Sequence, residues 1–108
     1  MYEYRAFVRR VYDGDTITVD IDLGFNIVAK NQKIRLLGIN APEIRGNSRK
    51  EGLKSRDFLR EKISGKWIIL KTQKDKKGKF GRWLGRIFFE NVEINQTMIK
   101  EGLAEKYE

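Results

Sequence analysis

The sequence predicts a mainly β protein with helices (α+β), in which five short strands close into a Greek-key barrel of the OB type. Two observations indicate this architecture. Short β-favouring runs separated by turn signals fill the first forty residues, and a stretch with helical periodicity follows them. The resulting order of elements is β-β-β-α-β-β-α, which is the layout of a five-stranded OB barrel. An SH3-like barrel is the alternative, but it has no place for a long helix after the third strand.

The first three strands are predicted at residues 4–11, 16–21 and 33–39, as an antiparallel meander. Residues 16–21 alternate cleanly between apolar and polar side chains, and the Asp-Gly dipeptide before them is a strong hairpin signal. A second turn is expected at 23–26. The third strand is expected to end at the Asn-Ala-Pro sequence that contains Pro42, because residues before a proline are biased towards extended conformations.

Helical character begins at Asn47 and continues to Ile63, with apolar residues broadly on one side of a 3.6-residue helix. Asn47 or Ser48 is the expected cap, and Ser64-Gly65 ends the helix in the usual glycine manner. The remaining elements are shorter. They are a strand at 67–70, a Lys- and Gly-rich loop at 72–81, a strand at 82–89, a turn at 90–91, and a helix at 96–101 that Asn95 caps and Gly102 ends.

The chain is predicted to form a single domain over residues 1–108, long enough to bury a real core. No apolar run approaches the ~20 residues needed to cross a bilayer, so no membrane partner is expected. The polar start fits a cytoplasmic chain or one whose export signal has been removed, and the sequence does not separate the two. No amphipathic seam indicates a dimer, so a monomer is the default expectation.

Two absent residue types narrow the chemistry. The sequence contains no cysteine, which excludes disulfides, thiolate metal sites and cysteine nucleophiles. It contains no histidine, so the commonest general base and the commonest zinc ligand are missing. Any hydrolytic chemistry must therefore rest on carboxylates, Lys and Arg, hydroxyls and a hard cation held by oxygen atoms.

The net charge of the chain is +8, and its pI is about 9.8. This excess raises the local concentration of polyanions and makes nucleic acid the default partner. A basic, soluble surface without such a partner is the alternative. Basic residues cluster at 45–62 and 71–86, which favours an interaction face.

Two carboxylates stand at the predicted first hairpin, in Asp13-Gly14-Asp15-Thr16. Carboxylate oxygens are ligands that a hard cation prefers. The alternative is equally simple, because Asp-Gly is a common hairpin turn and Asp15 can cap the local backbone. Taken alone, such a short motif often matches by chance.

Arg35 lies mid-strand, and with a period of two its side chain faces away from its apolar neighbours. It can point to solvent or pair with a surface acid. It can also converge with Glu43, just past the Pro42 turn, on one concave face. In that arrangement the guanidinium binds a phosphate bidentately while the carboxylate takes a proton from water.

Residues 79–83, with the sequence K-F-G-R-W, form the third candidate segment. A glycine beside an arginine, flanked by aromatic residues, suits backbone approach to a phosphate and stacking of a base. The alternative is a basic loop that Trp83 and Leu84 anchor in the core. For Trp83 this alternative is the better interpretation.

Together these segments resemble the staphylococcal nuclease (thermonuclease) family. The matching motifs are V-x-D-G-D-T at 11–16, R-L-x-G-I-x-A-P-E at 35–43 and K-F-G-R at 79–82, in the family's order and at compatible spacings. Residues 93–104 also look like the family's second helix. The resemblance covers nearly the whole chain. It implies an OB barrel that hydrolyses phosphodiester bonds in DNA and RNA, with Ca²⁺ as cofactor and single-stranded substrates favoured.

The resemblance also implies roles for individual residues. Arg35 and Arg82 match the two arginines that hold the scissile phosphate and neutralise charge growing on its oxygens. Glu43 matches the carboxylate that orients or deprotonates the attacking water. Asp15 matches the hairpin carboxylate that binds calcium, and Asp13 matches a second acid near the metal, outside its direct ligands.

The chain departs from the family pattern at the implied metal site. Asn40 stands where active members usually carry a metal-binding aspartate; its amide oxygen is still a ligand, but a negative charge is lost. Ala41 replaces a frequent threonine, although the implied ligand there is the backbone carbonyl. Lys79 falls where a lysine contacts a nucleotide phosphate, and Phe80 where the family often has tyrosine. Longer members carry tyrosines that pack on bound nucleotide, and here Tyr107 lies near that region.

Three functions remain open at this point. The first is a calcium-dependent nuclease, an endonuclease-type phosphodiesterase with a weakened metal site. The second is a nucleic-acid-binding module that has lost efficient turnover, and the third is a structural or protein-interaction OB domain. The joint presence of Asp15, Arg35, Glu43 and Arg82 favours the nuclease. A bare phosphate-binding surface has no need for a glutamate, which would repel the backbone of the nucleic acid.

Overall fold

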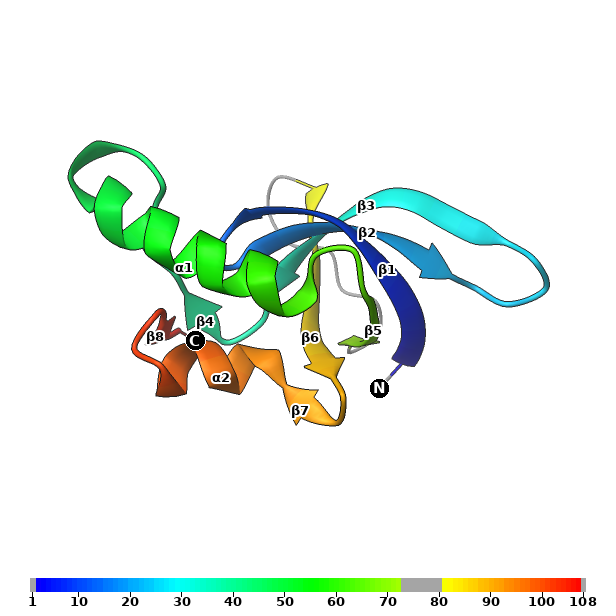
Figure 1. Ribbon diagram of the computed structural model, residues 1–108. Helices are drawn as coiled ribbons and strands as arrows, with labels where there is room; N and C mark the ends of the chain where they lie inside the picture. The colour runs from blue at the N-terminus through cyan, green and yellow to red at the C-terminus, as the bar shows by residue number, and fades with distance from the viewer. Residues whose placement is uncertain (1, 73–80, 108) are drawn as a thin grey trace.

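Five strands close into a barrel in the computed structural model, which describes residues 2–72 and 81–107 (Figure 1). Strands β1 to β3 form an antiparallel meander, β1 pairs with β5, β5 pairs with β6, and β6 pairs in parallel with β3. The barrel strands are β1 (Tyr2–Asp13), β2 (Thr16–Asp22), β3 (Val28–Leu36), β5 (Trp67–Thr72) and β6 (Trp83–Phe89). The predicted five-stranded barrel of the OB type, mainly β with helices, is confirmed.

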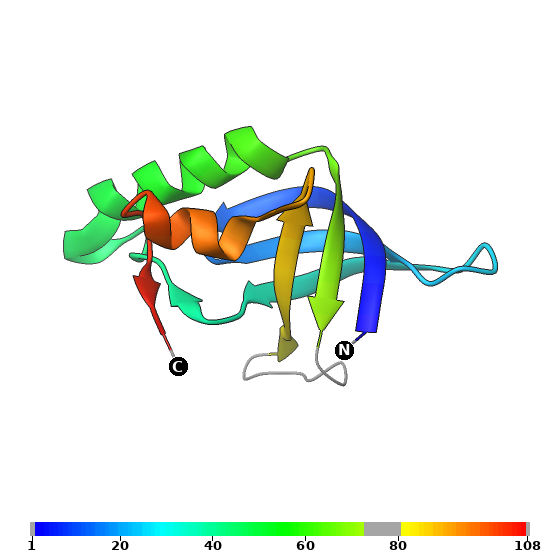
Figure 2. The ribbon, with the colours of Figure 1, turned by 90° about the horizontal axis from the view of Figure 1, so that it is seen from below.

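Two helices lie on the side of the barrel opposite to the projecting β2–β3 turn, as Figures 1 and 2 show. The longer one, α1 (Arg49–Ile63), follows a single 3₁₀ turn, and the shorter one is α2 (Ile94–Lys100). The small elements around them are the 3₁₀ helix η1 (Gly46–Ser48) and the strands β4 (Ile39–Asn40), β7 (Val92–Glu93) and β8 (Glu105–Lys106). Strands β4 and β8 pair with each other beside α2.

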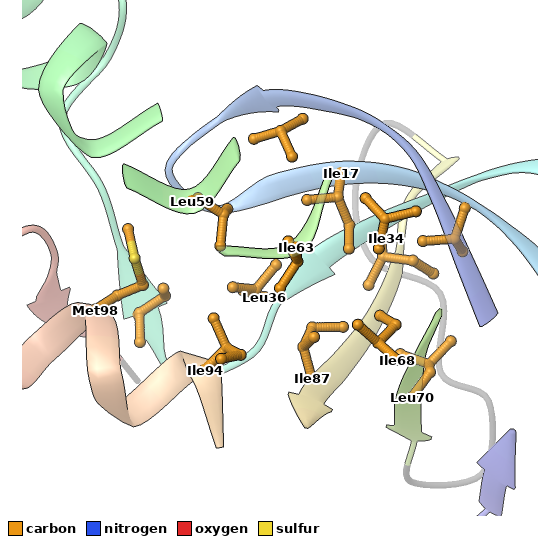
Figure 3. Packing of buried hydrophobic residues seen from close by; sticks show 14 of the residues in the cluster. Ile17, Ile34, Leu36, Leu59, Ile63, Ile68, Leu70, Ile87, Ile94 and Met98 are labelled. Atoms are coloured by element: carbon orange, nitrogen blue, oxygen red, sulfur yellow. The ribbon is translucent and has the colours of Figure 1, made fainter. Parts of the chain in front are cut away.

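The hydrophobic core fills the barrel and continues under both helices (Figure 3). Alternate residues of the strands point inward, among them Ile17 and Ile34, which are fully buried. α1 adds Leu59 and Ile63, and α2 adds Met98. Burial of each large aliphatic side chain contributes roughly 1.5–3 kcal/mol of transfer free energy. The two helices therefore complete the core at the end of the barrel where the chain places its acidic hairpin turn.

Close approach of α1 to two loops depends on glycine. A Cβ on Gly52 of α1 would overlap the carbonyl oxygen of Glu43, and a Cβ on Gly14 would lie 2.7 Å from the Cβ of Ala41. The same added atom on Gly14 would lie 2.8 Å from the Cβ of Ser55. Neither backbone nor Cβ atoms can move aside cheaply in a packed interior. These two glycines therefore set how near α1 lies to the segments that carry the candidate site.

The third strand differs from the prediction of 33–39 in both its ends. β3 begins at Val28, because residues 28–32 pair with β2, and it ends at Leu36. Gly38 then turns the chain with a φ of +81°, and Ile39 belongs to β4. The strand therefore ends at a glycine turn ahead of Asn-Ala-Pro, and the prediction that the proline segment ends it is wrong.

The predicted helix caps also differ in their chemistry. Ser48 does precede α1, but its hydroxyl donates to the carbonyl oxygen of Glu43 (3.1 Å) and makes no capping bond. The Ser64-Gly65 ending is confirmed, with Gly65 at a φ of +72°. Gly102, also at +72°, follows the end of α2 as expected.

Asn95 was expected to cap α2, and this expectation is wrong, because the helix begins at Ile94. The side chain of Asn95 is fully buried and bonds to the backbone of two strand segments instead. Its Nδ2 donates to the carbonyl oxygens of Leu37 (2.8 Å) and Gly85 (3.3 Å), and its Oδ1 accepts from the N–H of Ile87 (3.0 Å). Asn95 thereby fixes α2 to β6 and to the turn after β3.

The core-anchoring interpretation of Trp83 is confirmed. Its ring is partly buried against the hydrophobic cluster, and its Nε1 donates to Oε1 of Gln32 (3.0 Å). Within residues 2–72 and 81–107, no helix combines the length and the apolar character needed to span a bilayer.

We predict that Asn95→Leu destabilises the fold by about 2–4 kcal/mol, because the buried N–H of Ile87 loses its acceptor and the carbonyls of Leu37 and Gly85 each lose a donor. The loss should appear as a lower free energy of unfolding in urea at constant m-value. Asn47→Ala, in the exposed 3₁₀ turn before α1, is the matched asparagine control. An Asn95→Leu protein as stable as the wild type would contradict this role.

Candidate active site

The site is built on the turn that joins β1 to β2. Oδ1 of Asp13 accepts a hydrogen bond from the backbone N–H of Asp15 (3.0 Å), so the predicted Asp-Gly hairpin turn is present. Asp15 is 5% exposed, although turns of this kind usually lie at the surface. The reason is that Gly14 packs beneath α1 and carries Asp15 into the interior.

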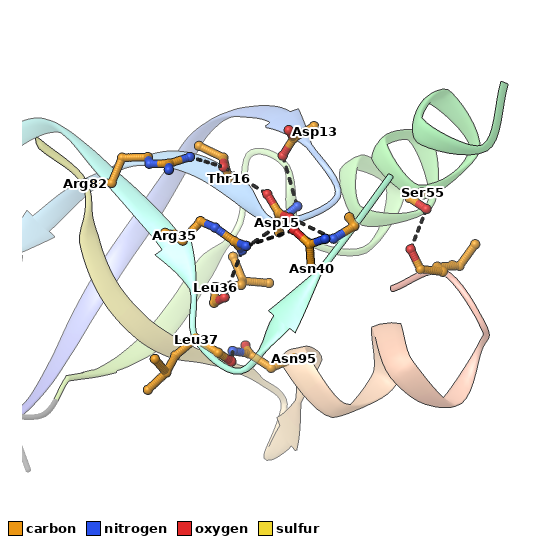
Figure 4. Close-up of polar contacts among 12 residues, drawn as sticks. Asp13, Asp15, Thr16, Arg35, Leu36, Leu37, Asn40, Ser55, Arg82 and Asn95 are labelled. Carbon is orange, nitrogen blue, oxygen red and sulfur yellow. Dashed lines mark hydrogen bonds and ion pairs between the residues drawn. The ribbon is translucent and has the colours of Figure 1, made fainter. Parts of the chain in front are cut away.

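The Asp15 carboxylate joins segments that are distant in the sequence (Figure 4). Its Oδ2 accepts from the backbone N–H of Ala41 (2.8 Å) and lies 3.2 Å from Nη1 of Arg35. Its Oδ1 accepts from the hydroxyl of Thr16 (3.1 Å). The backbone carbonyl of Asp15 also accepts from the N–H of Leu36 (2.8 Å). The turn, the end of β3 and the start of the proline segment are thus connected through one residue.

Arg35 faces away from its buried strand neighbours, as the alternation predicts, but it does not point to solvent. Its side chain is 15% exposed and pairs with Asp15. Nη1 also donates to the carbonyl oxygen of Leu36 and Nη2 donates to Oδ1 of Asn40, both at 3.2 Å. The guanidinium carbon lies 5.9 Å from the ring centroid of Tyr107. Arg35 is therefore held in one orientation before any ligand arrives.

A cleft of about 580 Å³ lies beside this network, and Glu43 and Arg82 both line it. Glu43 is exposed, and Nη1 of Arg82 donates to the hydroxyl of Thr16 (3.3 Å), which itself donates to Asp15. Arg82 rather than Arg35 thus shares the concave face with Glu43. The other lining residues are Arg10, Tyr12, Asp13, Thr16, Lys33, Ile44 and Arg45.

Three residues at the site had no role in the sequence-based prediction, and a fourth, Tyr107, was mentioned only in connection with bound nucleotide. Arg10, Tyr12 and Lys33 reach the cleft because they are outward residues of β1 and β3, a position that strand alternation could have indicated. Tyr107 reaches Arg35 because its N–H donates to the carbonyl oxygen of Gly38 (2.9 Å) beside the β4–β8 pair. No local sequence pattern predicts the contact between Arg35 and Tyr107.

Burial raises the pKa of Asp13 from 3.8 to about 6, and the neighbouring charge of Asp15 adds to the rise. The two carboxylates lie close enough to repel, so the folded protein holds a proton on Asp13 more tightly than the unfolded chain does. At neutral pH Asp13 is still mostly ionised. The turn then carries two negative charges, of which Arg35 compensates one directly.

The candidate calcium ligands are all oxygen atoms: the carboxylate of Asp15, the amide oxygen of Asn40 and the carbonyl of Ala41, with the carboxylate of Asp13 expected outside the direct ligands. This donor chemistry fits calcium, which prefers oxygen, and not a metal that needs nitrogen or sulfur. In the part of the chain that the structure describes, no three His, Cys, Asp or Glu residues gather as a metal-binding group. A cation here would have two carboxylates at most, so weak affinity is expected.

Asn40 and Ala41 also face a second, smaller hollow of about 440 Å³ that the residues after α2 complete. Glu105 lies directly opposite Asn40 in the β4–β8 pair. Lys79 and Phe80, expected to contact nucleic acid, fall in 73–80 and lie outside the described residues. Their expected roles stay predictions.

Comparisons with known proteins agree on one family. A family model described as "Staphylococcal nuclease homologue" matches residues 33–108. The chain is 33% identical over 100 residues to "Thermonuclease" of Staphylococcus hyicus, which covers 90% of this chain and 56% of that protein. It is 31% identical over 115 residues to "Endonuclease YhcR" of Bacillus subtilis (strain 168), which covers 97% of this chain and 9% of that protein.

A plant protein, "Probable staphylococcal-like nuclease CAN1" of Oryza sativa subsp. japonica, is 32% identical over 84 residues. That alignment covers 78% of this chain and 24% of the plant protein. The chain thus spans little more than half the length of the thermonuclease and smaller fractions of the other two relatives.

The raised pKa of Asp13 predicts a pH-dependent stability in the presence of a chelator. Because the folded state binds this proton more tightly, the free energy of unfolding falls as pH rises from about 4 to about 6 and levels off above. Asp13→Asn keeps the oxygen that accepts from Asp15 and removes the charge. It should exceed the wild type in stability by about 1–2 kcal/mol at pH 7, after allowance for solvent screening.

Urea unfolding of both proteins between pH 4 and pH 8 measures this difference. The stability gain of Asp13→Asn should grow through the window and stay constant above it. A gain that does not change with pH would show that Asp13 has an ordinary pKa.

Proposed function

The chain belongs to the staphylococcal nuclease family, and we propose that it is a calcium-dependent nuclease that hydrolyses phosphodiester bonds in DNA or RNA. The proposal carries over to this chain what the names of its relatives state of them, a thermonuclease and an endonuclease. The net charge of +8 supports a polyanionic substrate.

The observation that carries the proposal is the shared cleft of Glu43 and Arg82. A carboxylate and a guanidinium line one concave surface, and Thr16 connects that arginine to the buried Asp15. A surface that only bound phosphate would not benefit from an exposed glutamate among its arginines. A cleft that must both bind a phosphate and activate a water needs one group of each kind.

In the proposed mechanism, Glu43 accepts a proton from a water whose oxygen attacks the phosphorus atom. The bond from phosphorus to the leaving oxygen breaks on the opposite side, and that oxygen takes a proton from solvent. Arg82 donates to a non-bridging oxygen and stabilises the charge that develops there. Arg35 stabilises the same charge, since exchange of its Nη2 bond from Asn40 to a phosphate oxygen keeps the guanidinium paired.

Asp15, Asn40 and the Ala41 carbonyl would hold calcium, with Asp13 outside its direct ligands. When bound, the ion adds positive charge near the phosphate and lowers the pKa of a bound water. The hydrogen bond from Ala41 N–H to Asp15 keeps the hairpin turn and the proline segment together.

A nucleic-acid-binding module without efficient turnover is the second candidate. One observation favours it: Arg35 already pairs with Asp15 and bonds to Asn40, so a cation must compete for those oxygens. Asn40 adds no negative charge to help it. The two candidates share the basic cleft and differ only in whether Glu43 acts on a water.

We predict that Glu43→Gln lowers the cleavage rate by about 10²–10⁴-fold, because it removes the proton acceptor and keeps the shape of the side chain. The measurement is cleavage of single-stranded DNA and RNA across a calcium series up to about tens of millimolar. A chelator control at each substrate establishes the need for the ion. Because Glu43 is exposed, the substitution should leave the free energy of unfolding nearly unchanged, and urea unfolding verifies this.

If the wild type fails to cut at any calcium concentration, or cuts as fast with Glu43→Gln, the nuclease proposal is wrong. Salt-sensitive binding of the same DNA would then establish the binding module.

We also predict that Asn40→Asp strengthens calcium binding by about tenfold and raises the rate, because it adds one negative charge to the ligand set. Calorimetric titration with calcium, without substrate, measures the affinity independently of activity. Asn40→Ala is the control, and it should weaken binding, because it removes the amide oxygen. A lower rate and lower affinity for Asn40→Asp would contradict the assignment of Asn40 as a ligand.

A further inference from the structure

The outward face of β1 carries a row of cationic and aromatic side chains that the proposed chemistry does not use. Every second residue of the strand points outward up to a register shift between Val8 and Arg10, after which the alternation resumes in the opposite phase. The residues of this row, which we call the β1 surface together with Trp67 of β5, are Arg5, Phe7, Arg9, Arg10 and Tyr12.

One half of the β1 surface is a chain of ring contacts. Phe7 and Trp67 are direct cross-strand neighbours, with ring centroids 5.5 Å apart in an edge-to-face arrangement. The guanidinium of Arg5 lies 4.6 Å from the Trp67 ring, and that of Arg9 lies 5.6 Å from Phe7. Trp67 is nevertheless 49% exposed. A pair that served only to stabilise the sheet would gain more from burial of this ring.

The other half of the β1 surface enters the cleft. Arg10 and Tyr12 line it together with Glu43, and Tyr12 is 51% exposed. Arg10 stands in one cross-strand row with Thr18 of β2 and Lys33 of β3, and Lys33 lines the cleft as well. The path from the cleft to Trp67 therefore follows one continuous strand, which Figure 2 shows running alongside β5.

We propose that the β1 surface is a second binding site for single-stranded nucleic acid, which holds the strand on one side of the cleft by stacking bases on Trp67 and Tyr12. The inference rests on the proposed nucleic-acid substrate and adds where the strand runs. Exposed aromatic rings offer stacking platforms to any base, and interleaved arginines neutralise phosphates. Both are features of proteins that bind single strands without sequence preference.

The dimensions and charges of the β1 surface suit such a strand. From Arg5 to Tyr12 the strand extends over about 23 Å at roughly 3.3 Å per residue, which accommodates a few nucleotides. Arg9 forms an ion pair with Asp20, with 2.6 Å between Nε and Oδ2. This pair holds the Arg9 guanidinium over the Phe7 ring, so Arg9 supports the position of that ring. Arg5 and Arg10 are exposed and supply the charge. A double helix hides the faces of its bases, so stacking on Trp67 selects single strands.

The test is a binding measurement on protein that cannot cut. In the Glu43→Gln background with a chelator, Trp67→Ala should weaken binding of a fluorescein-labelled dT12 by about fivefold or more. Trp67→Tyr should retain the affinity within about twofold, because tyrosine also stacks. Phe25→Ala is the matched control: this aromatic residue is 95% exposed on the β2–β3 turn, outside the β1 surface, and its loss should change nothing.

A spectroscopic readout separates stacking from a general loss of structure. The sequence contains two tryptophans, so Trp83→Phe leaves Trp67 as the single emitter. With selective excitation of tryptophan, the fluorescence of Trp67 should be quenched on addition of dT12. It should remain unchanged on addition of a 12-base-pair duplex. Equal affinity for dT12 with and without Trp67→Ala in the Glu43→Gln background would overturn the proposal. Trp67 fluorescence that dT12 does not quench would also overturn it. Quenching by the duplex to the same extent would overturn the preference for single strands.

These outcomes are distinguishable from failure of the nuclease proposal. Absence of calcium-dependent cleavage, together with Trp67-dependent binding, would remove the nuclease and leave the second binding site. Calcium-dependent cleavage, together with binding that does not depend on Trp67, would support the nuclease proposal and remove the second binding site.

Discussion

The buried carboxylate of Asp15 is the constraint on which the rest of the site depends. An ionised carboxylate away from water costs several kcal/mol unless its oxygens accept hydrogen bonds or face a cation. Here the N–H of Ala41, the hydroxyl of Thr16 and the guanidinium of Arg35 meet that requirement. These three donors come from β2, from the proline segment and from β3. The hydrogen bonds and the ion pair of Asp15 therefore also fix the start of β2, the end of β3 and the start of the proline segment. Loss of any one partner would leave a buried charge poorly compensated.

Arg35 and Arg82 are connected to the Asp15 carboxylate in different ways. Arg35 pairs with Asp15 directly and is nearly buried, whereas Arg82 reaches Asp15 only through Thr16 and faces the cleft. In the structure without a ligand, Arg35 therefore balances the charge of Asp15, whereas Arg82 already lines the cleft where a phosphate could approach. Asn40 suits this arrangement because its amide oxygen accepts from Arg35 without placing another negative charge beside Asp15. Because Asn40 is neutral, the charge of Arg35 is balanced by that of Asp15 alone within this pair.

Glu43 is positioned by backbone packing more than by its own side chain. The helix α1 approaches so closely that only glycine fits at position 52, against the carbonyl of Glu43. The hydroxyl of Ser48 bonds to the same carbonyl. The backbone of Glu43 is therefore held on two sides at the edge of the cleft that this residue lines. Strand β1 then offers an extended surface that leaves the cleft and carries aromatic side chains.

Much of the fold followed from the sequence alone, because strand alternation, the Asp-Gly turn and the periodicity of residues 47–63 are local properties. The motifs around Asp15 and Glu43 also identified the family without any coordinates. Tertiary structure decided the rest: that Arg35 pairs with an aspartate 20 positions away, that Asn95 bonds to strands and does not cap, and which residues share the cleft. The physical reason is that a sequence pattern reports the conformation of a segment. Which buried donor meets which acceptor is settled only when distant segments close around the same core.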